Sequence, residues 1–243
     1  MSEVTLLGFL SPSNIPKVYD SFILQKINNI HKLMEYVEDV FEKRSSDFIE
    51  NLPDEDLKKY DKSELPWLDP YARDFEQMNR YSFLLRIHFL LEEYVVELCR
   101  LGNNKAWKNY KKKHSKKYSK IDMWNTLTSA GSFITEKLDQ EFPCGTEEWL
   151  TILKVHLIRN EIAHNGADIG RSRKYKQVEN KINKMKGISI GPHNSIILER
   201  DFCFDYLKTV SEFLSNLYKN YSSPPTINGV GFFYSWKSAS PQL

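Results

Sequence analysis

The sequence lacks features that mark several large classes of protein. It contains no run of 18 apolar residues, so no membrane-spanning helix is expected. Its first ten residues carry one acid and no Lys or Arg, unlike a signal peptide. It has no glycine-rich phosphate loop and no internal repeat. We therefore expect no membrane partner and no phosphate-binding loop.

Cysteine is also scarce. Cys99, Cys144 and Cys203 lie far apart and form no CxxC pair, which argues against a disulfide framework or a structural zinc site. Cys99 and Cys203 are flanked by apolar residues and are expected to fill the core of a cytoplasmic protein. Four histidines do not group with acids or cysteines at metal-ligand spacing: His31, His88, His114 and His193. We therefore expect no metal and no cofactor.

What the chain does contain is enough apolar material for a large core. It has 243 residues, of which 41% are hydrophobic and 27% charged. This composition is typical of a globular protein. The net charge of +2 hides segregation, because residues 35–64 carry eleven acids against five bases. Residues 105–120 hold eight Lys and no acid, and residues 171–186 hold seven bases and one acid.

Hydrophobic periodicity predicts a mainly α fold, a bundle of five to six helices with a small β-hairpin near 187–199. The expected helices span 15–50, 71–101, 122–140, 146–164, 172–186 and 200–221. We divide the chain into an N-terminal helical extension with an acidic loop (1–69), a helical bundle (70–221) and a flexible tail (222–243).

The helix expected over 71–101 is the most apolar. A 3–4 spacing gives it a core stripe of Phe75, Met78, Ser82, Leu85, Phe89, Glu92, Val96 and Cys99. Leu84, Ile87, Leu91, Val95 and Leu98 widen this stripe, which favours a central place in the bundle. Gly102 and Asn103 are expected to end the helix.

The most informative stretch is the end of the helix at 146–164. Arg159, Asn160 and His164 lie within one and a half turns, and Asn160 and His164, four residues apart, share a face. Asn165 and Gly166 follow directly and are expected to stop the helix. The three side chains are therefore predicted to lie at a helix C-terminus within reach of solvent.

This stretch resembles the signature of the HEPN superfamily, the higher eukaryotes and prokaryotes nucleotide-binding domain. That signature is an Arg, a polar residue that is commonly Asn, three further residues and a His on a late helix of a small bundle. Arg159, Asn160 and His164 match it position by position, and the resemblance covers roughly residues 70–221. One toxin branch of the family carries a Tyr two residues after the His, where this chain has Gly166.

The resemblance implies metal-independent RNA cleavage by a homodimer in which both motifs face one cleft. It also implies a toxin or defence effector, with a neutralising antitoxin or an activator as a further partner. The residue types suit this chemistry. A His can move the proton of an RNA 2′-OH near neutral pH, and an Arg matches phosphate oxygens. Asn160 can donate to a phosphate or orient His164.

Glu92 and His156 are candidate supporting residues. Glu92 falls on the apolar stripe and is expected to pair with Arg159 or His164, with Glu93 as the alternative. His156, three residues before Arg159, is a further RNA contact or a half-buried polar residue. The expected RNA-binding side chains are Lys111, Lys112, Lys113, Lys116, Lys117, Arg171, Arg173 and Lys174, with Trp107, Tyr110, His114 and Tyr118 interleaved for base stacking.

Two alternatives remain open at this point. The chain can be a non-catalytic module of the same fold that binds RNA, a nucleotide or a partner protein. It can also be a helical scaffold in which the motif is accidental. An exposed His164 is required by the ribonuclease hypothesis, and a His164 buried against its own chain would exclude it.

Overall fold

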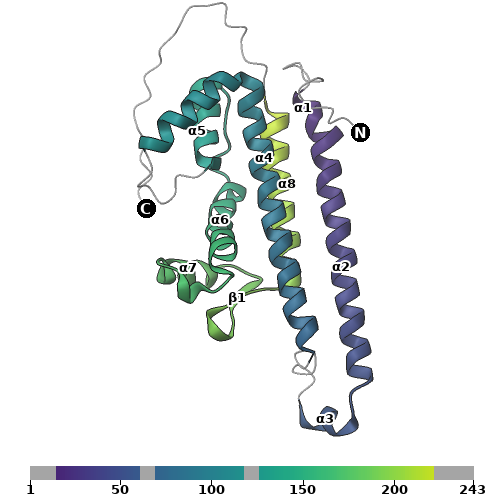
Figure 1. Ribbon diagram of the computed structural model, residues 1–243. Helices are drawn as coiled ribbons and strands as arrows, with labels where there is room; N and C mark the ends of the chain where they lie inside the picture. Colours follow the sequence, from purple (N-terminus) through teal and green to yellow (C-terminus); the bar gives the residue numbers. More distant parts are fainter. Residues whose placement is uncertain (1–14, 61–68, 118–125, 222–243) are drawn as a thin grey trace, which may run out of the picture.

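The computed structural model describes residues 15–60, 69–117 and 126–221, and it confirms a mainly helical fold with one small hairpin (Figure 1). Three long helices lie side by side: α2 (Leu24–Glu50), α4 (Pro70–Lys117) and α8 (Arg200–Lys219). α5 (Thr126–Leu138) packs on α4, and α6 (Glu147–Asn165) packs on both α4 and α8. In the described ranges, no helix combines the length and apolar character that a membrane span requires.

The helix predicted over 15–50 is continuous but not uniform. It begins as α1 (Ile15–Val18), passes through a single π-helical stretch, η3 (Tyr19–Ile23), and continues as α2. The loop predicted after it holds the short helix α3 (Asp54–Lys59). The tail expected from residue 222 lies outside the described residues.

The predicted helix end at Gly102 and Asn103 is a kink. Asn103 leaves helical geometry (φ −165°, ψ 91°), and its Oδ1 accepts a hydrogen bond from the Ala106 N–H at 2.9 Å. This side chain caps a second helical segment that continues to Lys117. A Cβ on Gly102 would lie 2.5 Å from a methyl carbon of Leu138, so a larger residue at this bend would force the Leu138 side chain of α5 to move.

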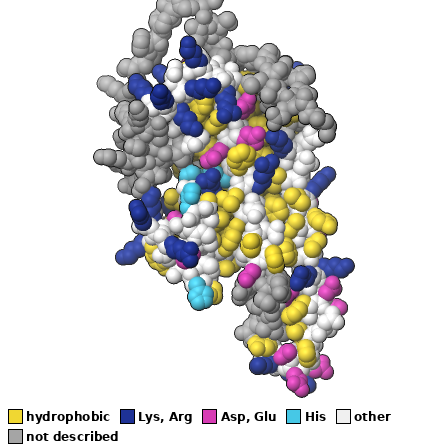
Figure 2. Space-filling view, viewed as in Figure 1, with side chains coloured by type: hydrophobic (Ala, Val, Ile, Leu, Met, Phe, Trp, Pro, Cys, Tyr) yellow, Lys and Arg dark blue, Asp and Glu magenta, His cyan; other side chains and the backbone are white. Residues whose placement is uncertain are grey.

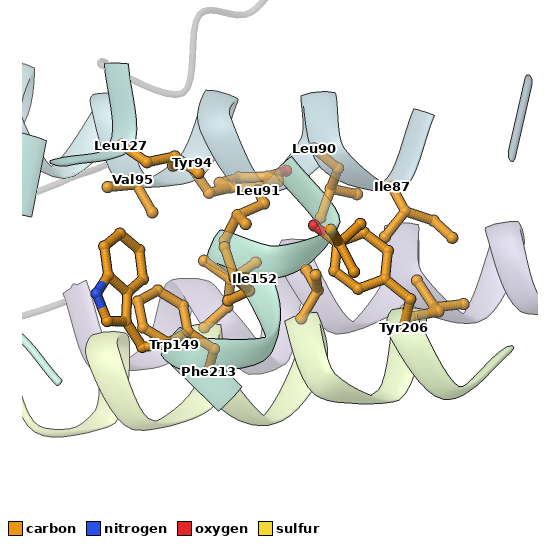
Figure 3. Packing of buried hydrophobic residues seen from close by; sticks show 14 of the residues in the cluster. Ile87, Leu90, Leu91, Tyr94, Val95, Leu127, Trp149, Ile152, Tyr206 and Phe213 are labelled. Carbon is orange, nitrogen blue, oxygen red and sulfur yellow. The ribbon is translucent and has the colours of Figure 1, made fainter. Parts of the chain in front are cut away.

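The first half of the α4 stripe that we predicted to be buried points outward, whereas Cys99 at its end is buried as predicted. Phe75, Met78 and Phe89 are about half exposed, whereas the flanking residues form the core. Figure 3 shows how those residues meet α6 and α8: Ile87, Leu90, Leu91, Tyr94 and Val95 of α4, Trp149 and Ile152 of α6, and Tyr206 and Phe213 of α8. The prediction failed because this helix is apolar on most sides, and packing of α6 and α8 decides which side is covered.

The segment between α6 and α8 holds the predicted hairpin. β1 (Ile188–Ile190) pairs antiparallel with β2 (Ile196–Leu198), and α7 (Tyr175–Ile182) precedes it, as the change of period predicted. A short 3-10 turn, η5 (Ile169–Arg171), joins α6 to α7.

Cys99 of α4 and Cys203 of α8 are buried and form no disulfide, which confirms their predicted place in the core.

Candidate functional site

The end of α6 carries the motif, and its boundaries follow the sequence closely. The Thr146 hydroxyl accepts a hydrogen bond from the Trp149 N–H at 3.2 Å and caps the start of α6. Gly166 ends it in the left-handed conformation (φ 62°), which a residue without Cβ adopts without strain. The motif therefore occupies the last two turns of a well-defined helix.

Arg159 and Asn160 are joined to a chain of buried polar groups. The Arg159 Nη1 donates to the Asn160 Oδ1 at 2.9 Å, and the Asn160 Nδ2 lies 3.1 Å from the His156 Nε2. The His156 Nδ1 lies 3.0 Å from the His88 Nε2, and the His88 Nδ1 lies 2.6 Å from the Tyr206 hydroxyl. A single run of hydrogen bonds thus links α6 to α4 and α8.

Arg159 determines which atom donates and which accepts in every hydrogen bond of this run. Arg159 can only donate, so its bond fixes the Asn160 oxygen and turns the amide N–H₂ toward His156. A neutral His156 then accepts at Nε2 and carries its proton on Nδ1, which donates to the His88 Nε2. A neutral His88 donates from Nδ1 to the Tyr206 oxygen. The motif therefore sets the tautomers of two histidines, one of which is fully buried.

Burial keeps both imidazoles neutral. Desolvation, together with the nearby His156 and Arg159, lowers the pKa of His88 to about 3. Desolvation, with the Arg159 charge, lowers the pKa of His156 to about 4. His156 is thus a half-buried polar residue that bonds to the motif. This agrees with the second interpretation given above, and not with a role as an RNA contact.

These low pKa values predict an acid-sensitive fold. Both histidines have a pKa near 6.5 when unfolded, so the unfolded chain binds more protons below that pH. The free energy of unfolding should fall by up to about 1.4 kcal/mol per pH unit per imidazole below pH 6.5, and lose this dependence above it. Urea unfolding of the wild type and His88→Gln at several pH values measures the slope. An equal slope in both proteins would contradict the assignment.

Glu92 joins the same cluster, as predicted. Its Oε2 lies 4.0 Å from the Arg159 Nη2, and its Oε1 lies 3.6 Å from the His88 Nε2. The Glu92 side chain is 20% exposed, so it borders the core and is not buried within it. Desolvation raises the pKa of Glu92, against the charges of Arg159 and Lys111. Glu93, the alternative, pairs with Lys26 at 3.6 Å instead.

His164 stands apart from this cluster. It is exposed, as the ribonuclease hypothesis requires, and no contact with Arg159 or Asn160 is found among the described residues. The buried Nε–H of Arg159 finds no hydrogen-bond partner in the part of the chain that the structure describes. The structure therefore joins Arg159 and Asn160 firmly and leaves His164 facing solvent at the same helix end.

The predicted RNA-binding side chains fall into two groups. Lys111, Lys112 and Lys113 are exposed on the last segment of α4, and the charge of Lys111 acts on Glu92. The side chains of Lys116 and Lys117, like that of His114 and residue Tyr118, lie outside the described residues. In Figure 2, Lys and Arg side chains gather over the upper part of the face that shows the histidines.

The second group follows α6. Arg171 pairs with Asp168 at 3.0 Å, Arg173 is exposed and Lys174 is half-buried. The Ser172 hydroxyl donates to the Glu161 carboxylate at 2.9 Å and ties this loop to α6.

The prediction that Trp107 and Tyr110 stack on RNA bases is wrong. Trp107 and Tyr110 are buried and pack edge-on against Phe133 of α5. They form the apolar side of an amphipathic segment whose other side carries the lysines. Their rings are therefore not available to unpaired bases.

Sequence reasoning missed His88 and Tyr206. We predicted wrongly that His88 does not group with acids. Glu92 lies one turn away on α4, and His156 faces both residues. The four-residue spacing of His88 and Glu92 was a usable signal, since it places both on one helix face. Nothing in the sequence connects Tyr206 of α8 with this pair.

Comparisons with models of known protein families, with curated proteins and with solved structures found no match for this chain.

Proposed function

We propose that this protein is a metal-independent endoribonuclease of the kind that the HEPN signature implies, acting as a homodimer. The observation that carries the proposal is the end of α6, where an exposed His164 follows an Arg159 and Asn160 pair fixed by hydrogen bonds. A toxin or defence role, and an antitoxin or activator that controls it, belong to the same proposal.

The reaction needs one base, one acid and a cation. His164 takes the proton of an RNA 2′-OH as that oxygen attacks the adjacent phosphorus, and the 5′-oxygen leaves with a proton from a second acid. The products are a 2′,3′-cyclic phosphate and a 5′-hydroxyl. The His164 of a second copy is the group best suited to be that acid. DNA lacks the 2′-OH and is not cleaved.

Arg159 and Asn160 have different roles: Arg159 contacts the phosphate, and Asn160 positions Arg159. One Nη1–H of the guanidinium binds Asn160 and the Nε–H is buried, so the remaining N–H donors of Nη1 and Nη2 are the ones that can contact a phosphate that gains charge. Asn160 uses both ends of its amide within the protein. It therefore acts as a positioning residue that holds Arg159.

A second copy can dock on the face that α4 leaves exposed. Met78, Leu85 and Phe89 lie there at intervals of seven and four residues and lead to Glu92, which pairs with Arg159 at 4.0 Å. Figure 2 shows hydrophobic side chains gathered over α4 and α2 on the face that also shows histidines over α6. A dimer formed there buries apolar surface beside the motif.

This interface predicts that Phe89→Glu produces a monomer. Phe89 is 52% exposed, so the substitution leaves the fold intact and places a charge in the contact between copies. Leu150→Glu is the matched control, because Leu150 is equally exposed but lies on the first turn of α6. Sedimentation of both variants tests it, and a Phe89→Glu protein that remains dimeric would place the interface elsewhere.

The function itself is tested by incubating the protein with RNA in excess EDTA, with DNA of the same sequence alongside. We expect RNA to be cut to cyclic phosphate ends and DNA to stay intact. Cleavage of both would contradict 2′-OH attack.

One observation favours a second candidate, the non-catalytic binding module. Arg159 faces the Glu92 carboxylate, and Asn160 is fully engaged inside the protein. RNA that binds in the EDTA assay without being cleaved would support this module.

A further inference from the structure

Three metal-ligating groups converge where α4 meets α6. The His88 Nε2 lies 3.0 Å from the His156 Nδ1 and 3.6 Å from the Glu92 Oε1, and all three ligand atoms lie within 4.8 Å of one another. A zinc ion with bonds of about 2.0–2.1 Å holds tetrahedral ligands roughly 3.4 Å apart. The two short separations bracket that value.

We propose that His88, Glu92 and His156 form a Zn²⁺ site whose occupation switches the ribonuclease motif off. Two imidazoles and one carboxylate are a donor set that zinc accepts, and a water molecule completes the tetrahedron. The His88 Nδ1–H already bonds to Tyr206, which is the outer hydrogen bond that orients a histidine ligand. The metal would bind Glu92 through Oε1, while Oε2 faces Arg159.

Zinc binding changes the tautomer of His156. Its Nδ1 now carries the proton and donates to His88, so coordination through Nδ1 moves that proton to Nε2. A protonated Nε2 cannot accept from the Asn160 N–H₂, and it needs an acceptor in its place. Asn160 must turn its oxygen toward His156, and this breaks the hydrogen bond from Arg159.

The switch therefore links a buried metal ion to the exposed end of α6. Arg159 is released from Asn160 and loses part of its attraction to Glu92, whose carboxylate now binds the ion, so its guanidinium is no longer held in place for a phosphate. Glu92 and His156 are half-buried, so the ion enters from their side, since His88 is fully enclosed. Zinc binding does not depend on the proposed function, but the inhibition rests on it.

The experiment uses Co²⁺, whose visible absorption reports tetrahedral coordination, with the full-length, tag-free protein. We expect one Co²⁺ per chain, displaced by Zn²⁺. Glu92→Gln and His156→Gln should weaken binding by about 100-fold or more. Glu35→Gln is the matched control, because His31 and Glu35 form an exposed pair at 3.3 Å with the same four-residue spacing. This variant should bind as the wild type does.

A second variant tests the tautomer switch. Asn160→Asp offers only acceptor oxygens to His156, so it should favour the metal-bound tautomer and tighten Co²⁺ binding. Absence of a tetrahedral spectrum, or a spectrum that survives Glu92→Gln, overturns the site. Tight binding with unchanged RNA cleavage overturns the switch alone. Absence of RNA cleavage with and without Zn²⁺ overturns the proposed function and leaves the site standing.

Discussion

His164→Ala is expected to lower the rate of RNA cleavage by about 10²–10⁴-fold, the range that general acid–base catalysis contributes. His164 is exposed and has no side-chain contact within residues 15–60, 69–117 and 126–221, so the free energy of unfolding should stay within about 0.5 kcal/mol of the wild type. Loss of activity without loss of stability is the signature of a residue that acts on the substrate. Single-turnover cleavage in EDTA, alongside urea unfolding, measures both effects.

His193→Ala is the control for this variant. His193 is exposed in the hairpin turn, so its loss should change neither rate nor stability. If the two variants cleaved RNA equally well, His164 would not be the base. In a heterodimer of wild-type and His164→Ala chains, a composite site predicts that activity falls well below half, because each site needs both copies.

The largest loss of stability is expected from Arg80→Met. Arg80 is buried, and it donates from Nε and Nη2 to the Glu38 carboxylate at 2.8 and 2.6 Å and from Nη1 to the Leu198 carbonyl at 2.9 Å. It also pairs with Glu76. Removing it leaves Glu38 buried without its cation, which costs about 3–5 kcal/mol. Urea unfolding measures this cost.

Arg200→Met is the matched control, because Arg200 of α8, like Arg80 of α4, pairs with acids of α2. Its bonds to Asp39 and Glu42 are exposed, and such pairs contribute about 1 kcal/mol or less. The double variant Arg80→Met with Glu38→Met should recover most of the loss, since neither charge of the buried Arg80–Glu38 pair remains. Equal effects of Arg80→Met and Arg200→Met would mean that burial does not decide the energy of these pairs.

The Arg80 pair also shows how α2 is held. Glu38 lies on α2, Arg80 on α4 and Leu198 on β2, so one guanidinium fixes three elements. No periodicity in the sequence connects these positions. The division at residue 69 between an N-terminal extension and the bundle stays a prediction.

The sequence by itself determined where α6 begins and ends, because those signals are local. Thr146 accepts from an N–H three residues later, and Gly166 adopts a left-handed conformation that depends on its own backbone. The change from helical to alternating spacing placed the hairpin of β1 and β2. The motif was found for the same reason, since three residues on one helix end keep their spacing in any fold.

Only the tertiary structure decided which faces are covered and which polar groups meet. α4 is apolar on nearly all sides, so its hydrophobic periodicity does not decide which side is buried. Packing against α6 and α8 buries Leu91 and leaves Phe89 exposed. Trp107 and Tyr110 became core residues because the kink at Asn103 carries them against Phe133. His88, His156 and Tyr206 come from three helices, and hydrogen bonds between distant segments leave no local trace in the sequence.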